Sequence, residues 1–175
     1  MKFSELPKFT RQGHYQVNMP LTYLLKWIKE CEEDLHLQLN PDFQRGHVWT
    51  EKQQIAFVEY LFKGGKAQRT IYFNSPSWSG NVNESDYNEF VCVDGLQRIT
   101  ACQKFLNNEI PIFGYYYKDF TDKLPMSIDL LLNINDLKTK KEVLQWYIEM
   151  NENGTPHTLK EIEKVKSMLK EENNG

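Results

Sequence analysis

Apolar residues recur at three- and four-residue intervals in five stretches of the chain, and this spacing predicts amphipathic helices. Thr50 and Gln53 form a capping-box pattern at the start of the second stretch, and Gly64-Gly65 ends it. We expect the helices to begin near residues 20, 50, 96, 141 and 159 and to end near residues 33, 63, 107, 150 and 170.

Shorter stretches alternate between apolar and polar residues or are continuously apolar, and both patterns are typical of strands. Pro111 places one of these strands at a sheet edge, because proline has no N–H group to donate to a neighbour. Residues 130–134 are apolar but fit a strand and a helix equally well. The predicted strands are 35–39, 70–73, 90–93 and 110–117.

Short strands among helices predict an α+β fold, in which a small mixed sheet is surrounded by helices. No series of parallel strands and helices is long enough for a Rossmann domain, and neither GxGxxG nor a Walker A run is present. We expect an irregular arm at 1–17, a single domain at 18–170 and a frayed tail at 171–175. Residues 74–89 are rich in Ser, Asn, Gly and Pro, which predicts a loop or a long hairpin tip.

The amino-acid composition and charge argue against several classes of protein. The 21 Lys and Arg residues are outnumbered by 24 Asp and Glu residues, so the formal charge of −3 argues against coating nucleic acid through net charge. The three cysteines form no CxxC pair, so neither a disulfide framework nor a structural zinc site is indicated. The N-terminus lacks the apolar run of a signal peptide and no later stretch is long enough to cross a membrane, which predicts a cytoplasmic protein.

The segment Phe90–Thr100 carries the strongest candidate chemistry. A buried strand stops at Asp94-Gly95 and turns directly into a helix, whose unpaired N–H groups and partial positive charge suit a phosphate. Gly95 has no side chain, so a ligand can approach its backbone closely. The Arg98 guanidinium can donate two parallel hydrogen bonds to phosphate oxygens. The alternative hypothesis is structural: Asp94 caps the helix and Arg98 makes an ion pair.

Two further clusters resemble ligand-binding loops. Gln44 and Arg45 precede the helix that Thr50 caps, and they repeat the Gln97-Arg98 pair, so the two loops could enclose one phosphate chain from both sides. The aromatic residues of the first loop, Phe43 and Trp49, are better explained as core residues. The third cluster, Asn151–Gly154 followed by Thr158-Leu159, is a glycine turn between two helices, and such a turn is usually a simple connection.

The three clusters together resemble the DUF262 family, the ParB/sulfiredoxin-like domain found at the N-terminus of GmrSD-type modification-dependent restriction enzymes and of phosphorothioate-sensing defence proteins. The family typically shows a Pro-(aromatic)-Gln-Arg…Trp segment, an Asp-Gly-Gln-Gln-Arg signature before a helix, and an Asn…Gly…Leu element. The resemblance spans about 18–165, and its motifs here are Pro41-Asp42-Phe43-Gln44-Arg45…Trp49, Asp94-Gly95-Leu96-Gln97-Arg98 and Asn151…Gly154…Leu159.

The resemblance implies nucleotide binding or hydrolysis at this signature, coupled to a DNA-related process such as restriction or phage–host conflict. By this similarity Asp94 would position Mg²⁺ or water, and Gly95 with the following N–H groups would hold phosphate. Gln97 and Arg98 would contact phosphate or orient the attacking water, and Gln44 and Arg45 would complete the pocket. Leu96 departs from the signature, because it replaces the first glutamine and removes a polar group that hydrolysis would use.

Three hypotheses therefore stay open at the level of the sequence. The first is a domain that binds an NTP of unidentified base with Mg²⁺, as a sensor or a slow NTPase. The second is a metal-dependent nuclease built on Asp42, Glu51 and Asp94, although no HNH-like cluster and no PD-(D/E)xK pattern is present. The third is a catalytically silent adaptor for DNA or for a separate effector protein, using residues 74–89 and the tyrosines of 115–117. Sulfiredoxin-like redox chemistry is disfavoured, because Cys92 and Cys102 both fall on predicted core faces.

Overall fold

The protein is described here by a computed structural model. The structure describes residues 2–11, 13, 15–44, 46, 48–78, 87–152 and 159–174. None of the described helices is long and apolar enough to cross a membrane.

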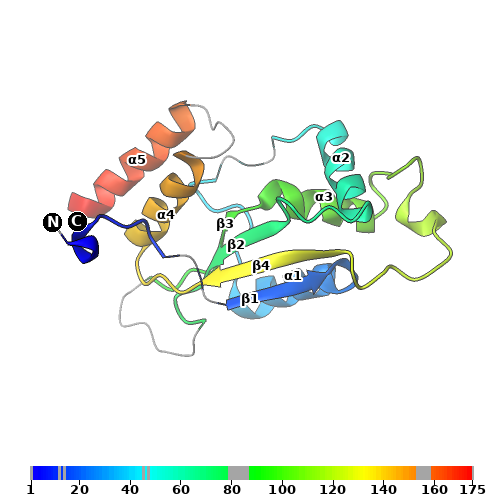
Figure 1. The fold of residues 1–175 in the computed structure, drawn as a ribbon, viewed down its shortest axis with the longest axis horizontal. Coiled ribbons are helices and arrows are strands. Elements are labelled where there is room, and N and C mark those ends of the chain that lie inside the picture. The colour runs from blue at the N-terminus through cyan, green and yellow to red at the C-terminus, as the bar shows by residue number, and fades with distance from the viewer. Residues whose placement is uncertain are drawn as a thin grey trace.

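A four-stranded mixed sheet forms the centre of the fold, with the strand order β1-β4-β2-β3 (Figure 1). Strand β4 pairs antiparallel with β1 and parallel with β2, and β2 pairs antiparallel with β3. The strands are β1 Tyr15–Pro20, β2 Thr70–Asn74, β3 Val91–Asp94 and β4 Asp129–Asn135.

Among the described residues, five α-helices surround this sheet, one short 3₁₀ helix, η1 Phe3–Glu5, precedes β1, and a second, η2 Tyr117–Asp119, lies between α3 and β4 (Figure 1). The predicted α+β class with a small mixed sheet is therefore confirmed. The α-helices are α1 Leu21–Leu35, α2 Glu51–Phe62, α3 Leu96–Leu106, α4 Lys140–Glu152 and α5 Leu159–Asn174. Helix α5 includes most of the predicted frayed tail.

Both faces of the sheet are covered, and alternate residues of the strands point into separate cores. Ile71, Phe73 and Cys92 belong to the larger core, which α1, α2 and α3 complete. Val91 and Val93 point to the other face, where they pack with residues of α4 and with Val165 of α5. Burial on both faces explains why β3 has a continuous apolar sequence.

Local sequence signals set several helix ends. The Thr50 hydroxyl accepts a hydrogen bond from the Gln53 N–H, and the Gln53 side chain accepts from the Thr50 N–H, so the predicted capping box is present. Helix α1 ends at Leu35, and the next residue, His36, adopts a left-handed conformation and donates its N–H to the Cys31 carbonyl.

Two predicted strands were wrong. Within 35–39, Leu35 still belongs to α1 and only Gln38 forms an isolated bridge to Val91. Within 110–117, Phe113 and Gly114 both have positive φ and form a two-residue turn, across which Ile112 and Tyr115 exchange hydrogen bonds.

One strand was missed and one ambiguity is resolved. Strand β1 lies at the end of the predicted irregular arm, and its signal was the alternation of Tyr15, Val17 and Met19. Residues 130–134 belong to β4, an inner strand that pairs with β1 and β2. A strand buried on both faces loses alternation, so the apolar run alone did not distinguish strand from helix.

All three cysteines are buried, as the core-face pattern predicted for Cys92 and Cys102. Burial raises the pKa of the Cys31 thiol to about 11, helped by the neighbouring acidic side chains of Glu30, Asp34 and Glu32. Burial also raises the pKa of Cys102 to about 12, and it raises the pKa of Cys92 further still. These neutral thiols lack the activation that redox chemistry requires.

The raised pKa values predict a loss of stability in mild alkali. In the unfolded chain the thiols lose their protons at about pH 8.5, whereas in the folded chain they keep them. The free energy of unfolding should therefore fall as the pH rises above this value. We expect a loss of roughly 1 kcal/mol for each thiol between about pH 8.5 and 9.5, measured by urea unfolding. A Cys102→Ala variant should show a shallower decline. Equal slopes for the variant and the parent protein would contradict this account.

Candidate functional site

The predicted strand-to-helix junction is present, but Asp94 does not cap the helix. Gly95 is the N-cap of α3 and has no side-chain hydrogen bond to offer. Asp94, the last residue of β3, instead pairs with Arg98 one turn into the helix, with 2.6 Å between Oδ2 and Nη2. The Asp94 side chain is 36% exposed and that of Arg98 is 18% exposed, so the pair lies at the edge of the core.

The Arg98 guanidinium also joins α3 to the start of β2. Its Nη1 donates to the backbone carbonyls of Gln68, at 3.2 Å, and of Thr70. A guanidinium has five N–H donors. The described contacts use both terminal nitrogens, and Arg98 retains further donor capacity for an anion while it holds Asp94 and the β2 backbone together.

Gly95 is required by packing against the neighbouring strand. Its φ of +117° is rarely adopted by residues with a side chain. A Cβ at this position would lie 2.6 Å from Ile71 Cδ1 and 3.2 Å from Ile71 Cα. The glycine in the signature therefore allows α3 to start directly against β2, whether or not a ligand approaches.

The Gln97 side chain fastens a second loop to this junction. Its Oε1 accepts hydrogen bonds from the Val48 and Trp49 N–H groups, both at 3.0 Å, and its Nε2 donates to the Gly46 carbonyl. One amide thus binds three backbone groups of residues 46–49. The loop that carries the second Gln-Arg pair is held against the N-terminus of α3.

Gln44 makes the reciprocal contact. Its Nε2 donates to the carbonyls of Cys92 and Val93 in β3, at 3.0 and 2.9 Å. The two predicted motifs are therefore joined in both directions, by Gln44 to the strand and by Gln97 to the loop. Arg45, predicted to complete the pocket, lies outside the described residues.

Leu96 is packed in the interior, and the described part of the third motif makes a contact within its own helix. Leu96, which stands where the family signature has glutamine, is 4% exposed and buried at the start of α3. Asn151 donates its side-chain N–H to the Tyr147 carbonyl within α4. Gly154 lies outside the described residues, and Leu159 is described only as the first residue of α5.

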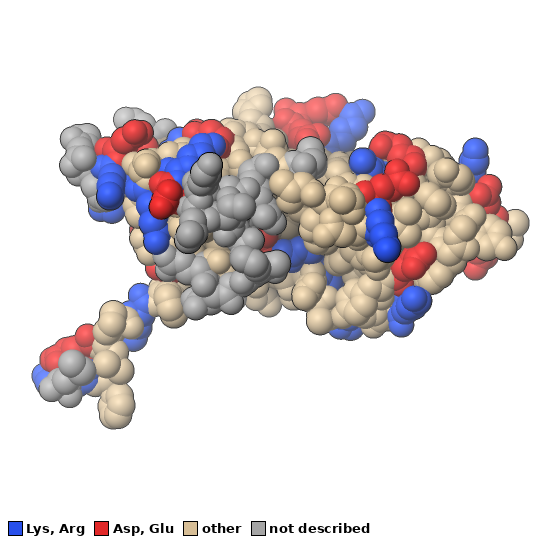
Figure 2. All heavy atoms as spheres, turned by 90° about the horizontal axis from the view of Figure 1, so that it is seen from above, with Lys and Arg blue, Asp and Glu red and all other residues tan. Residues whose placement is uncertain are grey.

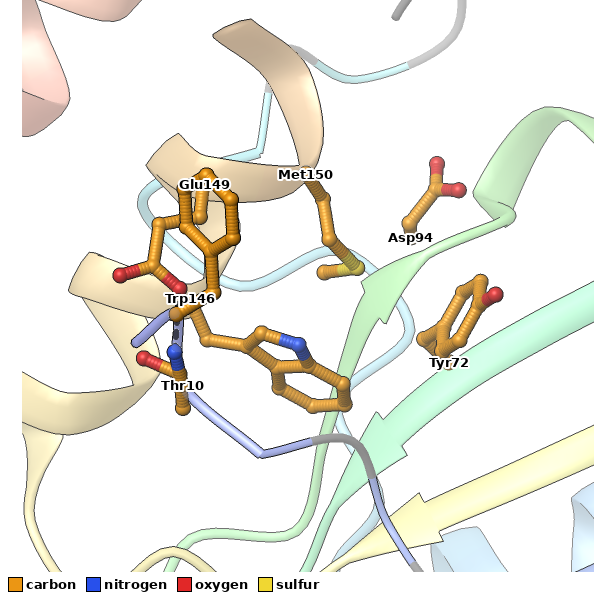
Figure 3. A pocket seen from close by; sticks show the side chains of 7 residues that line it. Thr10, Tyr72, Asp94, Trp146, Glu149 and Met150 are labelled. Carbon is orange, nitrogen blue, oxygen red and sulfur yellow. Dashed lines mark hydrogen bonds between the residues drawn. The ribbon is translucent and has the colours of Figure 1, made fainter. Parts of the chain in front are cut away.

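Asp94 also lines a cavity of about 330 Å³ that was not predicted (Figure 3). Figure 3 shows Asp94 and Tyr72, from β3 and β2, on one side and side chains of α4 on the other, with Met150 between them. The volume is in the range of about 300–1,000 Å³ that small-molecule sites occupy. Its described lining is Phe9, Thr10, Tyr72, Asp94, Trp146, Glu149 and Met150.

A second cavity, of about 400 Å³, lies beside segments that the signature side chains contact. Two of its lining residues, Trp49 and Gln68, are held through their backbones by Gln97 and Arg98. The signature side chains therefore support the walls of two cavities, and Asp94 lines the first one directly.

The carboxylates of the nuclease hypothesis are not gathered into a metal centre. Within the described ranges no group of three His, Cys, Asp or Glu side chains is arranged to hold a metal ion. Asp42 pairs with Lys140 at 3.0 Å, and Oδ2 of Asp94 is engaged by Arg98. A nucleotide-bound Mg²⁺ ion would need only one or two protein carboxylates beside phosphate oxygens and water, and Asp94 would be one such carboxylate.

Charge on the surface is mixed rather than basic. Figure 2 shows Lys and Arg side chains interspersed with Asp and Glu over the coloured part of the face that it displays. A polyanion would therefore be bound locally, through positioned donors, and not through a broad basic surface.

The packing of Gly95 can be tested against a matched glycine. Gly95→Ala should lower the free energy of unfolding by about 2–4 kcal/mol, because it adds a clash with Ile71 to an unfavourable φ. Gly64 has a φ of +86°, but a Cβ at that position would meet no atom within 4 Å, so Gly64→Ala should cost only about 1 kcal/mol. Urea unfolding measures both, and equal losses would show that Ile71 does not constrain position 95.

The Gln97 contacts predict a local change in hydrogen exchange. In Gln97→Ala the Val48 and Trp49 amides lose their acceptor and should exchange about 10-fold faster or more. Gln53→Ala is the matched control, since the Gln53 side chain accepts from the Thr50 N–H and its loss should affect that amide instead. Unchanged exchange at Val48 and Trp49 would mean that Gln97 does not hold the loop in solution.

Comparison with known proteins places this junction within a family. No curated protein and no solved structure was found to match the chain. The sequence model of the N-terminal domain of the GmrSD restriction endonuclease matches residues 28–132, more than half of the 175 residues. The matched range contains Gln44, Arg45 and the whole Asp94–Arg98 signature. The chain therefore belongs to the GmrSD restriction endonuclease N-terminal domain family, as the DUF262 resemblance predicted.

Proposed function

We propose that this domain binds a nucleoside triphosphate at the β3–α3 junction and serves as a nucleotide-dependent regulatory domain in a restriction process. The observation that carries the proposal is the Gln97 contact, which brings the loop of the second Gln-Arg pair onto the N-terminus of α3. Family membership supports the DNA-related setting.

The chemistry of the junction suits phosphate oxygens. N–H groups in the first turn of a helix have no partner within the helix, and the helix dipole favours an anion there. Arg98 lies in that turn, and Arg45 is the residue after Gln44 in the sequence, so each of the two motifs would supply one guanidinium group to the phosphates. Mg²⁺ carried by the nucleotide would neutralise phosphate charge, with Asp94 as its protein ligand.

Binding is better supported than rapid hydrolysis. Leu96 is buried and apolar, so position 96 has no polar group to orient an attacking water. The Gln97 amide already has three backbone partners. A domain of this kind would hold a nucleotide and turn it over slowly, which suits a sensor.

A second candidate function, a catalytically silent adaptor, is favoured by the same internal contacts. Backbone groups are hydrogen-bonded by the side chains of Gln44, Gln97 and Arg98. A role in holding the fold together therefore explains why these residues are present in the motifs. Of the tyrosines suggested for an interface, Tyr115 and Tyr116 are exposed, whereas the Tyr117 ring packs 5.6 Å from Phe105.

Titration of ATP, GTP, CTP and UTP with Mg²⁺ tests nucleotide binding. Arg45→Ala should weaken binding by about 10-fold or more, the usual effect of losing a hydrogen bond to a charged group. Arg45 is a better test than Arg98, because Arg98→Ala also removes the contacts to Asp94 and β2. Lys26→Ala is the control, since Lys26 is an exposed residue of α1 paired with Glu30.

Calorimetry measures affinity, and phosphate release measured on the same samples separates a sensor from an NTPase. Absence of binding by all four nucleotides would reject the proposal and leave the adaptor. Equal affinities of the parent protein and Arg45→Ala for nucleotide would show that Arg45 does not contribute to binding.

A further inference from the structure

The cavity beside Asp94 has a largely apolar lining. Tyr72 packs edge-to-face against the buried Trp146, at 89° with centroids 5.9 Å apart, and Phe9 and Met150 complete the apolar lining. Phe9 is 73% exposed and so has a ring face that the protein does not cover. Stacking on aromatic side chains is how proteins commonly hold nucleic acid bases.

The charged groups in the described lining of the cavity are both hydrogen-bond acceptors. Its charged lining residues are Asp94 and Glu149, and no Lys or Arg is among the described lining. Asp94 lies toward α3, where it would meet the Mg²⁺ ion, whereas a carboxylate without a metal ion, such as Glu149, accepts hydrogen bonds and repels phosphates. If the phosphates of a bound nucleotide lie at the α3 N-terminus, this neighbouring cavity therefore suits the base, and it suits a base whose edge presents N–H donors.

Glu149 is held in a fixed orientation. Its Oε2 accepts from the Thr10 backbone N–H at 2.8 Å, and its Oε1 accepts from the Gln145 side chain at 2.9 Å. Figure 3 shows the Thr10 contact beside Trp146. Two oxygens of a carboxylate offer about four acceptor positions, so each oxygen of Glu149 retains capacity for another donor.

We infer that this cavity selects guanine, with Glu149 accepting from the base, an inference that rests on the proposed nucleotide binding. Guanine presents two adjacent donors, the ring N1–H and the 2-amino group, which match the two oxygens of one carboxylate. Adenine and cytosine present an amino group beside an acceptor, and uracil presents a single ring N–H. Glu149 thus determines specificity, while the α3 N-terminus holds the phosphates.

Competition among GTP, ITP and ATP tests this inference on the full chain. ITP keeps the ring N1–H of GTP but lacks the 2-amino group. GTP should bind about 10- to 100-fold more tightly than ITP, because a site that hydrogen-bonds a polar group rejects an analogue without it. ATP should bind at least as weakly as ITP.

Glu149→Gln should remove the preference for GTP over ITP, because one acceptor oxygen becomes an amide that faces the N–H donors of the base. The control variant is Gln68→Asn, which alters the second cavity and keeps a residue type that tolerates the φ of +57° at this position. It should leave the preference unchanged.

The outcomes separate the two proposals. Equal affinity for all three nucleotides in the parent protein would overturn guanine selection and leave nucleotide binding intact. A preference that survives Glu149→Gln but is lost in Gln68→Asn would place the base in the other cavity and also overturn it. No binding of any nucleotide would overturn both the inference and the proposed function.

Discussion

The exchange of hydrogen bonds between two glutamines and two backbone segments is the contact on which the rest of the candidate site depends. Gln97 binds the backbone of residues 46–49, and Gln44 binds two carbonyls of β3. Each contact joins segments about 50 residues apart in the chain, the sequence separations being 48 to 51. A side-chain amide can both donate and accept, so one residue type can satisfy N–H and carbonyl groups of the same loop. An alanine at either position would leave these backbone groups without their partners.

This arrangement changes how the signature is understood. In Asp-Gly-Leu-Gln-Arg, the glycine allows close packing against Ile71, the leucine enters the core, and the glutamine fastens a loop. Asp94 and Arg98 are the charged members, and they are paired with each other at the edge of the core. A motif that supports a ligand site can thus consist largely of residues that hold its walls. In the proposed site, the charged pair and the cavity next to it would carry the ligand chemistry.

The sequence predicted most elements because their signals are local. The helices α2 and α3 follow from a capping box and from apolar spacing, and β3 follows from its apolar run before Asp94-Gly95. Two predictions from short apolar segments were wrong. Leu35 continues a helix, and the segment after Ile110 turns at Phe113 and Gly114, because positive φ values there reverse the chain. The cavity was not predicted, since its lining comes from residues 9–10, 72, 94 and 146–150, which only the fold brings together.

The sequence by itself determined the α+β class, the family and the junction at which Asp94, Gly95, Gln97 and Arg98 meet, because periodicity, turn residues and motif order act over short stretches of chain. Only the tertiary structure decided what those side chains contact. Hydrogen-bond partners such as Val48 for Gln97 and Thr70 for Arg98 depend on how distant strands and loops pack, and no local pattern records that packing. The same packing created the acidic, aromatic cavity beside Asp94, because its walls belong to separate elements that the sheet brings together.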